Sequence, residues 1–501
     1  MSFARVALSG SIWSLGQMLV ERGLQAALFF IAAKLLGPAE FGVAAIAISL
    51  PMVFVATLYG TVQVIIQREQ VTDDFLATAF WFAIGLGLAF SAATIALSPL
   101  IAHLVTAPNL IVYMVPAAFA PLATSLGVVG EGILTRKFEF RMLAIRRTAG
   151  LFGSAPFCII LAFAGYGPWS LIANTLLTSL ISSSVALFGS GFKPRFFVDR
   201  RELRDLARMA TYTSFAQASA QANTRLADLA IGIFAGPATA GTFRIARTII
   251  DLIISVVYQP LTSVLMPIFS RLAVDRQRAA GALVQIMFLS CTVLGLPLIA
   301  IFSSGEAVSR LLVSHEWVDL GPLLAWMAVA YPTNAIIGSS QTFSISQGWV
   351  RMGLALTLVD LVPNMIFLSI GASHGPTVLG IMFSLRAYVV SAVVLAILTR
   401  ADPLLAPRRF IAALMPCYIA LAIGALIWVT KSLLPVVTHL LVPGLLLGTI
   451  GLLLYVGMVF LLCREKLLAV FDMVPLPTRA RRLLRPYLER DLSKQFEKNF
   501  N

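Results

Sequence analysis

The chain has 501 residues, of which 59% are hydrophobic and only 12% are charged. Soluble globular proteins carry about 25% charged residues, so this composition excludes a soluble enzyme and indicates a polytopic membrane protein. The net charge of +14 comes mainly from cations in short loops between apolar runs, a pattern typical of membrane topology rather than nucleic-acid binding. Neither the four cysteines nor the four histidines have metal-site spacing, so we predict no metal, no cofactor and no disulfide framework.

Apolar runs long enough to cross a bilayer as helices recur along the whole chain. Each span needs about 20 residues, and the runs predict an all-α integral membrane fold with about 14 transmembrane helices. The predicted spans lie near residues 9–33, 42–66, 77–100, 110–134, 147–165, 168–190, 211–235, 242–268, 281–303, 320–345, 353–372, 376–399, 410–430 and 437–463. Prolines in the fourth and fifth spans are expected to bend those helices.

Basic residues are distributed unequally between the two sides of the membrane. An even number of spans places both termini on one side, and the loops of that side include the clusters at 136–147 and 193–208. The positive-inside rule therefore predicts that both termini are cytoplasmic. The tail, residues 464–501, is predicted to be a basic amphipathic helix that rests on the anionic inner leaflet or docks synthesis partners.

The first part of the chain resembles the second. A shift of 200 residues aligns the polar positions of the first span with those of the seventh, and a shift of 199 aligns Gly37-Pro38 with Gly236-Pro237. We predict an N-terminal six-helix lobe in residues 1–200, a C-terminal six-helix lobe in 201–400 and two additional helices in 401–463. An even number of spans per repeat makes the lobes parallel, and such lobes commonly enclose a central site.

The seventh predicted span, within residues 211–236, has one side that is too polar to face lipid. Its polar residues fall within an arc of roughly 100° on a helical wheel; they are Ser214, Gln217, Gln221, Thr224, Arg225 and Asp228. Because an ionised Arg at mid-membrane costs at least ~2.5 kcal/mol, this side is predicted to line a cavity. The alternative is that Arg225 and Asp228, three residues apart, form a buried pair that only locks helices together.

The first span has a matching stripe of Ser14, Gln17, Glu21 and Gln25 on one face, with Arg22 about 80° from its middle. On the eighth span, Arg244, Arg247, Asp251 and Tyr258 share a face about 60° wide. We interpret the surplus of guanidinium groups as an anion site, because their planar forked donors suit phosphate. The alternative for Arg247 and Asp251 is an ion pair that settles helix packing. Asp360 is interpreted as a partner of Arg386 or as part of an ion-coupling site.

Three stretches resemble a known family: Ser9-Gly10-Ser11-Ile12-Trp13-Ser14-Leu15, Leu35-Leu36-Gly37-Pro38-Ala39-Glu40-Phe41-Gly42 and Gly165-Tyr166-Gly167-Pro168-Trp169-Ser170-Leu171. The chain is similar to the polysaccharide-transport branch, the Wzx-like flippases, of the multidrug/oligosaccharidyl-lipid/polysaccharide exporter superfamily. This resemblance implies two six-helix lobes around a central cavity. It also implies transfer of an undecaprenyl-pyrophosphate-linked oligosaccharide across a bacterial inner membrane, beside a polymerase and a chain-length regulator.

The sequence therefore predicts a lipid-linked oligosaccharide flippase that works by alternating access and is not an enzyme. Arg225 and Arg247 are expected to bind the pyrophosphate, with Arg244, Arg22 and Tyr258 nearby. The predicted sugar-chamber residues are Gln17, Glu21, Gln25, Gln217 and Gln221, and the predicted ion-pair or coupling residues are Asp228, Asp251 and Asp360. Three alternatives remain at this point: a cation-coupled exporter of drugs or metabolites, a membrane glycan polymerase or ligase, and a structural scaffold.

Overall fold

In the computed structural model, the described residues are 22–258, 275–312, 316–349, 358–405, 407–433 and 441–464, with single positions at 269, 272, 352, 355, 356 and 466. Regular secondary structure in this part of the chain is entirely helical, as the sequence predicts. Among these residues, nine helices are long and apolar enough to cross a membrane, or ten if one bent pair is a single span. The count of fourteen transmembrane helices remains a prediction. Helix α9 is not among the nine; its first half bears the predicted polar stripe.

The helices belong to two compact units, each with its own packing. The first unit comprises residues 1–252, 309–323 and 357–383, and the second comprises the remainder. Helices mainly of the first unit are α2 (Pro38–Gln67), α3 (Asp73–Leu104), α4 (Leu110–Ala117), α5 (Ala120–Ser125), α6 (Val128–Arg136), α7 (Phe140–Phe163), α8 (Trp169–Gly189), α9 (Arg200–Val257) and α15 (Leu361–Ser373). Those mainly of the second are α11 (Arg276–Leu312), α12 (Leu320–Ala328), α13 (Tyr331–Ser346), α16 (Pro376–Ala401), α17 (Pro407–Ala413), α18 (Met415–Leu433) and α20 (Leu441–Leu462).

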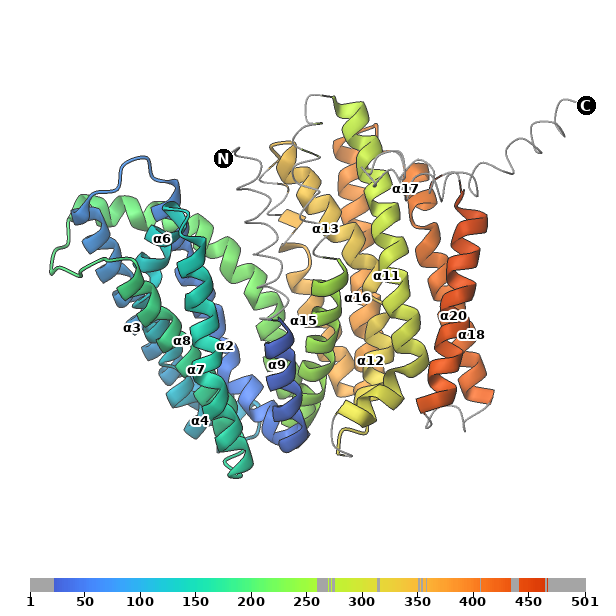
Figure 1. Cartoon of the computed structure of the whole chain (residues 1–501), viewed down its shortest axis with the longest axis horizontal. Helices are drawn as coiled ribbons and strands as arrows, with labels where there is room; N and C mark the ends of the chain where they lie inside the picture. The colour runs from blue at the N-terminus through green and yellow to red at the C-terminus, as the bar shows by residue number, and fades with distance from the viewer. Residues whose placement is uncertain are drawn as a thin grey trace, which may run out of the picture. The chain divides into compact units, whose positions relative to one another are not determined.

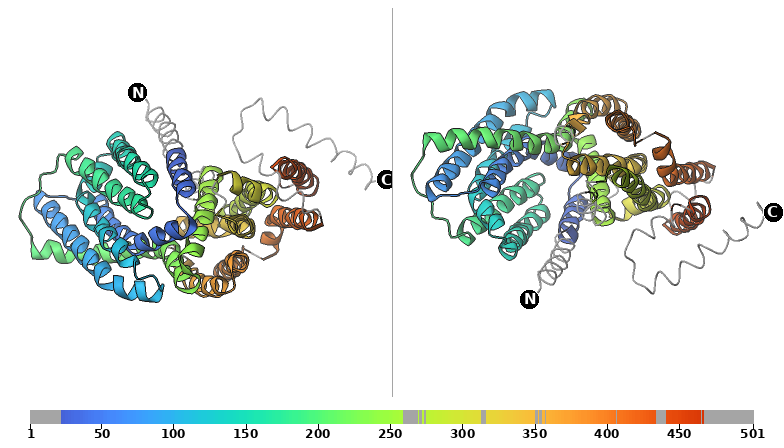
Figure 2. Two further views of the ribbon diagram at one scale, coloured as in Figure 1. Left: turned by 90° about the horizontal axis from the view of Figure 1, so that it is seen from below. Right: turned by 90° about the horizontal axis from the view of Figure 1, so that it is seen from above.

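Proline interrupts the fourth predicted span, whereas the fifth, with Pro156 inside it, is the single helix α7. The expected span at 110–134 consists of three short helices, with Pro116 inside α4 and Pro121 in the first turn of α5. Proline has no amide hydrogen and crowds the preceding turn, so a continuous ladder of backbone hydrogen bonds does not form there. The following pair, α7 and α8, lies side by side (Figures 1 and 2), and the Ser154 and Thr178 hydroxyls are 2.7 Å apart across it.

Helix α9 packs along α2 in the antiparallel direction. At the middle of α2, Ser214 Oγ donates a hydrogen bond of 2.7 Å to the carbonyl oxygen of Thr57, and a Cβ atom at Gly60 would overlap that hydroxyl. At the end of α2, Arg68 forms a two-pronged ion pair with Glu202, with distances of 2.6 and 3.0 Å. The hydroxyl and the small residue allow the two backbones to approach closely, as in other membrane helix pairs.

The other end of α2 crosses the second half of α9 through two glycines. A Cβ atom on Gly42 would overlap the carbonyl oxygen of Pro237, and one on Gly241 would overlap that of Pro38 and lie 2.8 Å from the Gly42 nitrogen. Gly42 and Gly241 are equivalent positions under the 199-residue shift. The matched turn motifs therefore meet backbone to backbone, which explains why both copies require glycine at this position.

The second unit contains one strongly bent helix pair, α12 and α13, and one pair of neighbouring helices, α18 and α20. Helices α12 and α13 meet at an angle of 46° next to Pro332, which is in the first turn of α13. Helices α18 and α20 lie side by side (Figures 1 and 2). Tyr455 of α20 is buried against α11, where its hydroxyl donates a hydrogen bond of 2.9 Å to the Thr292 carbonyl oxygen. This bond satisfies a polar group that would otherwise be unpaired in an apolar interior.

We expect Gly42→Ala to lower the stability of the protein, because the new methyl group must displace the Pro237 carbonyl. Overpacking of this kind costs about 1–3 kcal/mol. The matched control is Gly85→Ala in α3, where a Cβ atom would meet nothing within 4 Å. Alanine there is expected to be neutral or to stabilise the helix by about 1 kcal/mol. Thermal unfolding in detergent measures both, and equal melting temperatures for the two variants would contradict the close crossing.

Candidate functional site: a charged cluster on α9

The cluster depends on a break in α9. Helical geometry runs from Arg200 to Val257 except at Gly236, whose φ is 81° and ψ is 172°. Only glycine adopts these angles without strain, and Pro237 starts the second half. The break turns the chain so that residues before and after it, sixteen positions apart, come into contact.

Asp228 and Arg244 form the central pair of the cluster. Arg244 Nη1 donates a hydrogen bond of 2.7 Å to Asp228 Oδ2. The Asp228 side chain is 1% exposed and that of Arg244 is 18% exposed. The partner of Asp228 is thus on the second half of α9, whereas the sequence offered Arg225 as its partner on the same face.

Arg225 has an incomplete set of partners. Its Nε and Nη1 atoms are buried and donate no hydrogen bond to any described residue, and the second carboxylate oxygen of Asp228, Oδ1, is likewise buried and accepts none. A buried donor without an acceptor is unfavourable, and more so for a charged group. The structure therefore leaves one guanidinium available to an additional acceptor within the cluster.

Arg247 and Asp251 form a second, more open pair. Arg247 Nε donates a hydrogen bond of 3.3 Å to Asp251 Oδ1, and Asp251 is 53% exposed. The Arg247 guanidinium also lies over the Phe383 ring, 5.4 Å from its centroid. Stacking on an aromatic ring holds the planar group in one orientation while leaving its other edge open. The ion pair that the sequence analysis gave as the alternative for Arg247 and Asp251 is therefore present in the structure.

Helix α15 and its first residues contact α9 at the helical turn that contains Arg225. On α9 the contact is made by a residue that does not belong to the predicted polar stripe. Asn223 Nδ2 donates a hydrogen bond of 2.6 Å to Asp360 Oδ2, and Asn364 Nδ2 donates one of 2.6 Å to the backbone oxygen of Asn223. Asn364 is fully buried. Asn223 was missed by sequence reasoning because it lies off the polar arc; the signal available was its position two residues before Arg225. These bonds hold the turn that bears Arg225 in place.

The other residues predicted to bind the substrate lie near the N-terminus, on α9 and in the second unit. Arg22 Nη1 donates a weak hydrogen bond of 3.4 Å to Gln25 Oε1, while Gln217 is exposed and Gln221 is partly exposed. Tyr258 belongs to the second unit, where it is buried with its hydroxyl 3.5 Å from that of Ser339. Gln17, Glu21 and the tail prediction from residue 467 lie outside the described residues.

A second buried pair was missed by sequence reasoning. Arg146 Nη1 donates a hydrogen bond of 2.6 Å to Glu131 Oε2, and both residues are 8% exposed. The assignment of Arg146 to a cytoplasmic loop is wrong, because α7 begins at Phe140 and carries Arg146 into the interior. Glu131 was the available signal, as the one acidic residue of an apolar run needs a partner. The pair joins α6 to α7.

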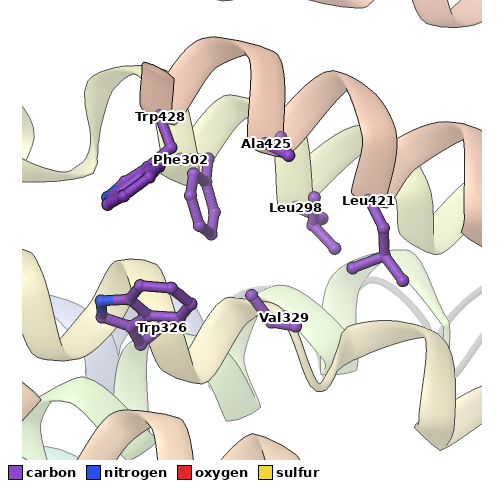
Figure 3. A pocket seen from close by; sticks show the side chains of 8 residues that line it. Leu298, Phe302, Trp326, Val329, Leu421, Ala425 and Trp428 are labelled. Atoms are coloured by element: carbon purple, nitrogen blue, oxygen red, sulfur yellow. The ribbon is translucent and has the colours of Figure 1, made fainter. Parts of the chain in front are cut away.

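A pocket within the second unit differs in character from the α9 cluster (Figure 3). It has a volume of about 180 Å³ and is lined by Leu298, Phe302, Trp326, Val329, Leu421, Gly424, Ala425 and Trp428. The ring centroids of Trp326 and Trp428 are 6.4 Å apart. The side chains that line it are apolar and aromatic, and none of them is charged.

Comparison with known proteins places this architecture in a family. Residues 31–322, more than half of the chain, match the family model described as polysaccharide biosynthesis protein. The chain belongs to this family. The resemblance inferred from the sequence motifs is therefore confirmed.

Two bacterial proteins with names that refer to polysaccharide biosynthesis are similar to this chain. The succinoglycan biosynthesis transport protein ExoT of Rhizobium meliloti (strain 1021) is 24% identical over 353 residues, which cover 69% of this chain and 70% of ExoT. The lipopolysaccharide biosynthesis protein WzxC of Escherichia coli (strain K12) is 21% identical over 338 residues, which cover 66% of this chain and 68% of WzxC.

Solved structures show the same fold at low sequence identity. The lipid II flippase MurJ in its inward closed conformation gives a TM-score of 0.71 at 14% identity, covering 90% of this chain and 99% of MurJ. An inward-facing multidrug resistance MATE family transporter of the MOP superfamily gives 0.62 at 15% identity, covering 80% and 95%. This polysaccharide biosynthesis protein therefore has the helical fold of that transporter superfamily.

The two Arg–Asp pairs on α9 are expected to differ in their contribution to stability. Arg244→Gln removes the guanidinium that is hydrogen-bonded to the buried carboxylate of Asp228, and breaking a buried ion pair costs about 3–5 kcal/mol. Arg247→Gln leaves Asp251 in an exposed position, where losing an ion pair costs about 1 kcal/mol or less. Thermal unfolding of the two variants in one detergent tests this difference. Equal losses would show that Asp228 is hydrated and does not depend on Arg244.

Proposed function

We propose that this protein is a flippase that moves a lipid-linked oligosaccharide across a bacterial inner membrane, with both termini cytoplasmic. The proposed substrate has a polyprenyl chain, a diphosphate and a sugar chain. Membership of the polysaccharide biosynthesis family supports the substrate class, as do relatives named for succinoglycan transport and lipopolysaccharide biosynthesis. The fold shared with a lipid II flippase supports transport rather than synthesis, and hence a protein that is not an enzyme.

The single observation that carries the proposal is the Arg225 guanidinium, whose buried Nε and Nη1 atoms have no hydrogen-bond acceptor among the described residues. An ionised group inside a helical bundle needs either a countercharge or a ligand. Asp228 already pairs with Arg244, and Asp251 with Arg247, so Arg225 is the surplus cation of the cluster. A diphosphate would complete its donor set with two or more charge-assisted hydrogen bonds.

The sign of the cluster separates this proposal from cation export. Three guanidinium groups against two carboxylates give the α9 cluster a net positive charge, which repels cationic drugs and attracts anions. The nearby amides of Gln217 and Gln221 offer donors and acceptors for sugar hydroxyls, and their exposure leaves them accessible. The polyprenyl chain would remain in the bilayer, because its transfer into a polar chamber is unfavourable.

Replacement of Arg225 with glutamine is expected to reduce transport at least tenfold while the protein stays folded. Loss of a hydrogen bond to a charged group is worth about 1.5–3 kcal/mol, which corresponds to roughly ten- to hundredfold. The measurement is transfer of a fluorescently labelled undecaprenyl-diphosphate oligosaccharide between leaflets of proteoliposomes. Competition by excess inorganic pyrophosphate in the same assay tests whether the protein recognises the diphosphate without the lipid and the sugars.

The matched control is Arg208→Gln, the same substitution on the same helix at an exposed position. It should transport at the wild-type rate. If Arg225→Gln also transports at that rate, as a monodisperse protein of unchanged melting temperature, then Arg225 does not bind the substrate and the proposal is wrong.

A further inference from the structure

The charged cluster contains two unsatisfied groups of opposite sign on one helical face. Among the residues that the structure describes, two buried donors of Arg225 have no acceptor, and one buried acceptor of Asp228, Oδ1, has no donor. The residues are three positions apart on the first half of α9, a spacing at which helical side chains meet. They form no hydrogen bond with each other in this structure, although such a bond would satisfy both.

The cause of this separation is the pairing of Asp228 with Arg244. The hydrogen bond of 2.7 Å to Oδ2 fixes the carboxylate toward the second half of α9. Asn364, which bonds to the Asn223 backbone oxygen, holds the neighbouring turn from the other side. Arg225 is three positions before Asp228 on the same half of α9, a spacing at which its guanidinium can reach the carboxylate.

We infer that Asp228 is an internal competitor of the substrate diphosphate for Arg225. In this inference, which rests on the proposed function, Arg225 alternates between two acceptors. It binds the diphosphate when the substrate is loaded, and it bonds to Asp228 Oδ1 when the substrate leaves. The competing carboxylate weakens binding and promotes release, so a full turnover requires both residues.

The electrostatic argument supports competition rather than a purely structural role. A diphosphate held by Arg225 would lie near the carboxylate of Asp228, and like charges in a low-dielectric interior repel strongly. If Asp228 served only to hold Arg244, one of its oxygens would be enough, and the buried Oδ1 would remain unsatisfied in every state. A transporter must release its substrate as well as bind it, and a competing acceptor provides that step.

The test compares Asp228→Asn with wild type, using the full-length protein in nanodiscs and inorganic pyrophosphate as the probe. Asparagine keeps a side-chain oxygen for Arg244 but removes the negative charge that competes for Arg225. We expect pyrophosphate to bind about tenfold more tightly to Asp228→Asn, a change of about 1.4 kcal/mol. We also expect a lower maximal rate and a lower KM for transport of the labelled undecaprenyl-diphosphate oligosaccharide.

The matched control is Asp205→Asn. Asp205 is exposed on α9 and forms no ion pair with any described residue. Its affinity and its rate should equal those of wild type. Unchanged or weaker pyrophosphate binding by Asp228→Asn overturns the inference, because a residue that merely supports Arg244 would weaken the site when changed. If wild type binds neither pyrophosphate nor the labelled lipid, the proposed function itself fails, which is a different result.

A second variant covers the case in which Asp228→Asn does not fold. The double variant Asp228→Asn/Arg244→Gln replaces the buried ion pair with a neutral hydrogen-bonded pair and leaves the net charge of the cluster unchanged. Arg225 then has no internal competitor, so the double variant is expected to bind pyrophosphate more tightly than wild type. Binding at wild-type strength or below overturns the inference.

Discussion

An ionised group in the interior of this membrane protein is costly without a partner, and the ion pair between Asp228 and Arg244 is the clearest case of such pairing. Removing water from a carboxylate is costly, and a guanidinium at 2.7 Å offsets that cost. The pair forms only because Gly236 turns α9 back on itself. A backbone angle available to glycine therefore determines where the charges of the site can lie.

Close backbone contact is the second constraint on the first unit. Gly42 and Gly241 meet where α2 crosses the second half of α9, and Gly60 admits Ser214 further along α2. In lipid, helices associate through packing and hydrogen bonds rather than through the hydrophobic effect. These contacts give α9 a fixed position against α2, so the charged face of α9 is held in a defined orientation.

Polar and apolar recognition are separated within the molecule. The α9 cluster in the first unit presents cations and amides, while the pocket between α11, the α12–α13 bend and α18 presents aromatic and aliphatic surface. The cationic cluster is the feature that suits the proposed substrate, because phosphate is the part of that substrate to which guanidinium groups bind most strongly.

Composition and periodicity alone determined that the chain is an all-helical membrane protein, since apolar runs of bilayer length leave no other solution. They also placed Arg225, Asp228, Arg244 and Arg247 on shared faces, because residues of one helix keep a fixed angular relation. Only the tertiary structure decided that Asp228 pairs with Arg244, that Asn223 and Asn364 brace the site, and that Glu131 holds Arg146. Those contacts join different helices, or the two halves of α9 across the break at Gly236, and the helical period carries no information across such junctions.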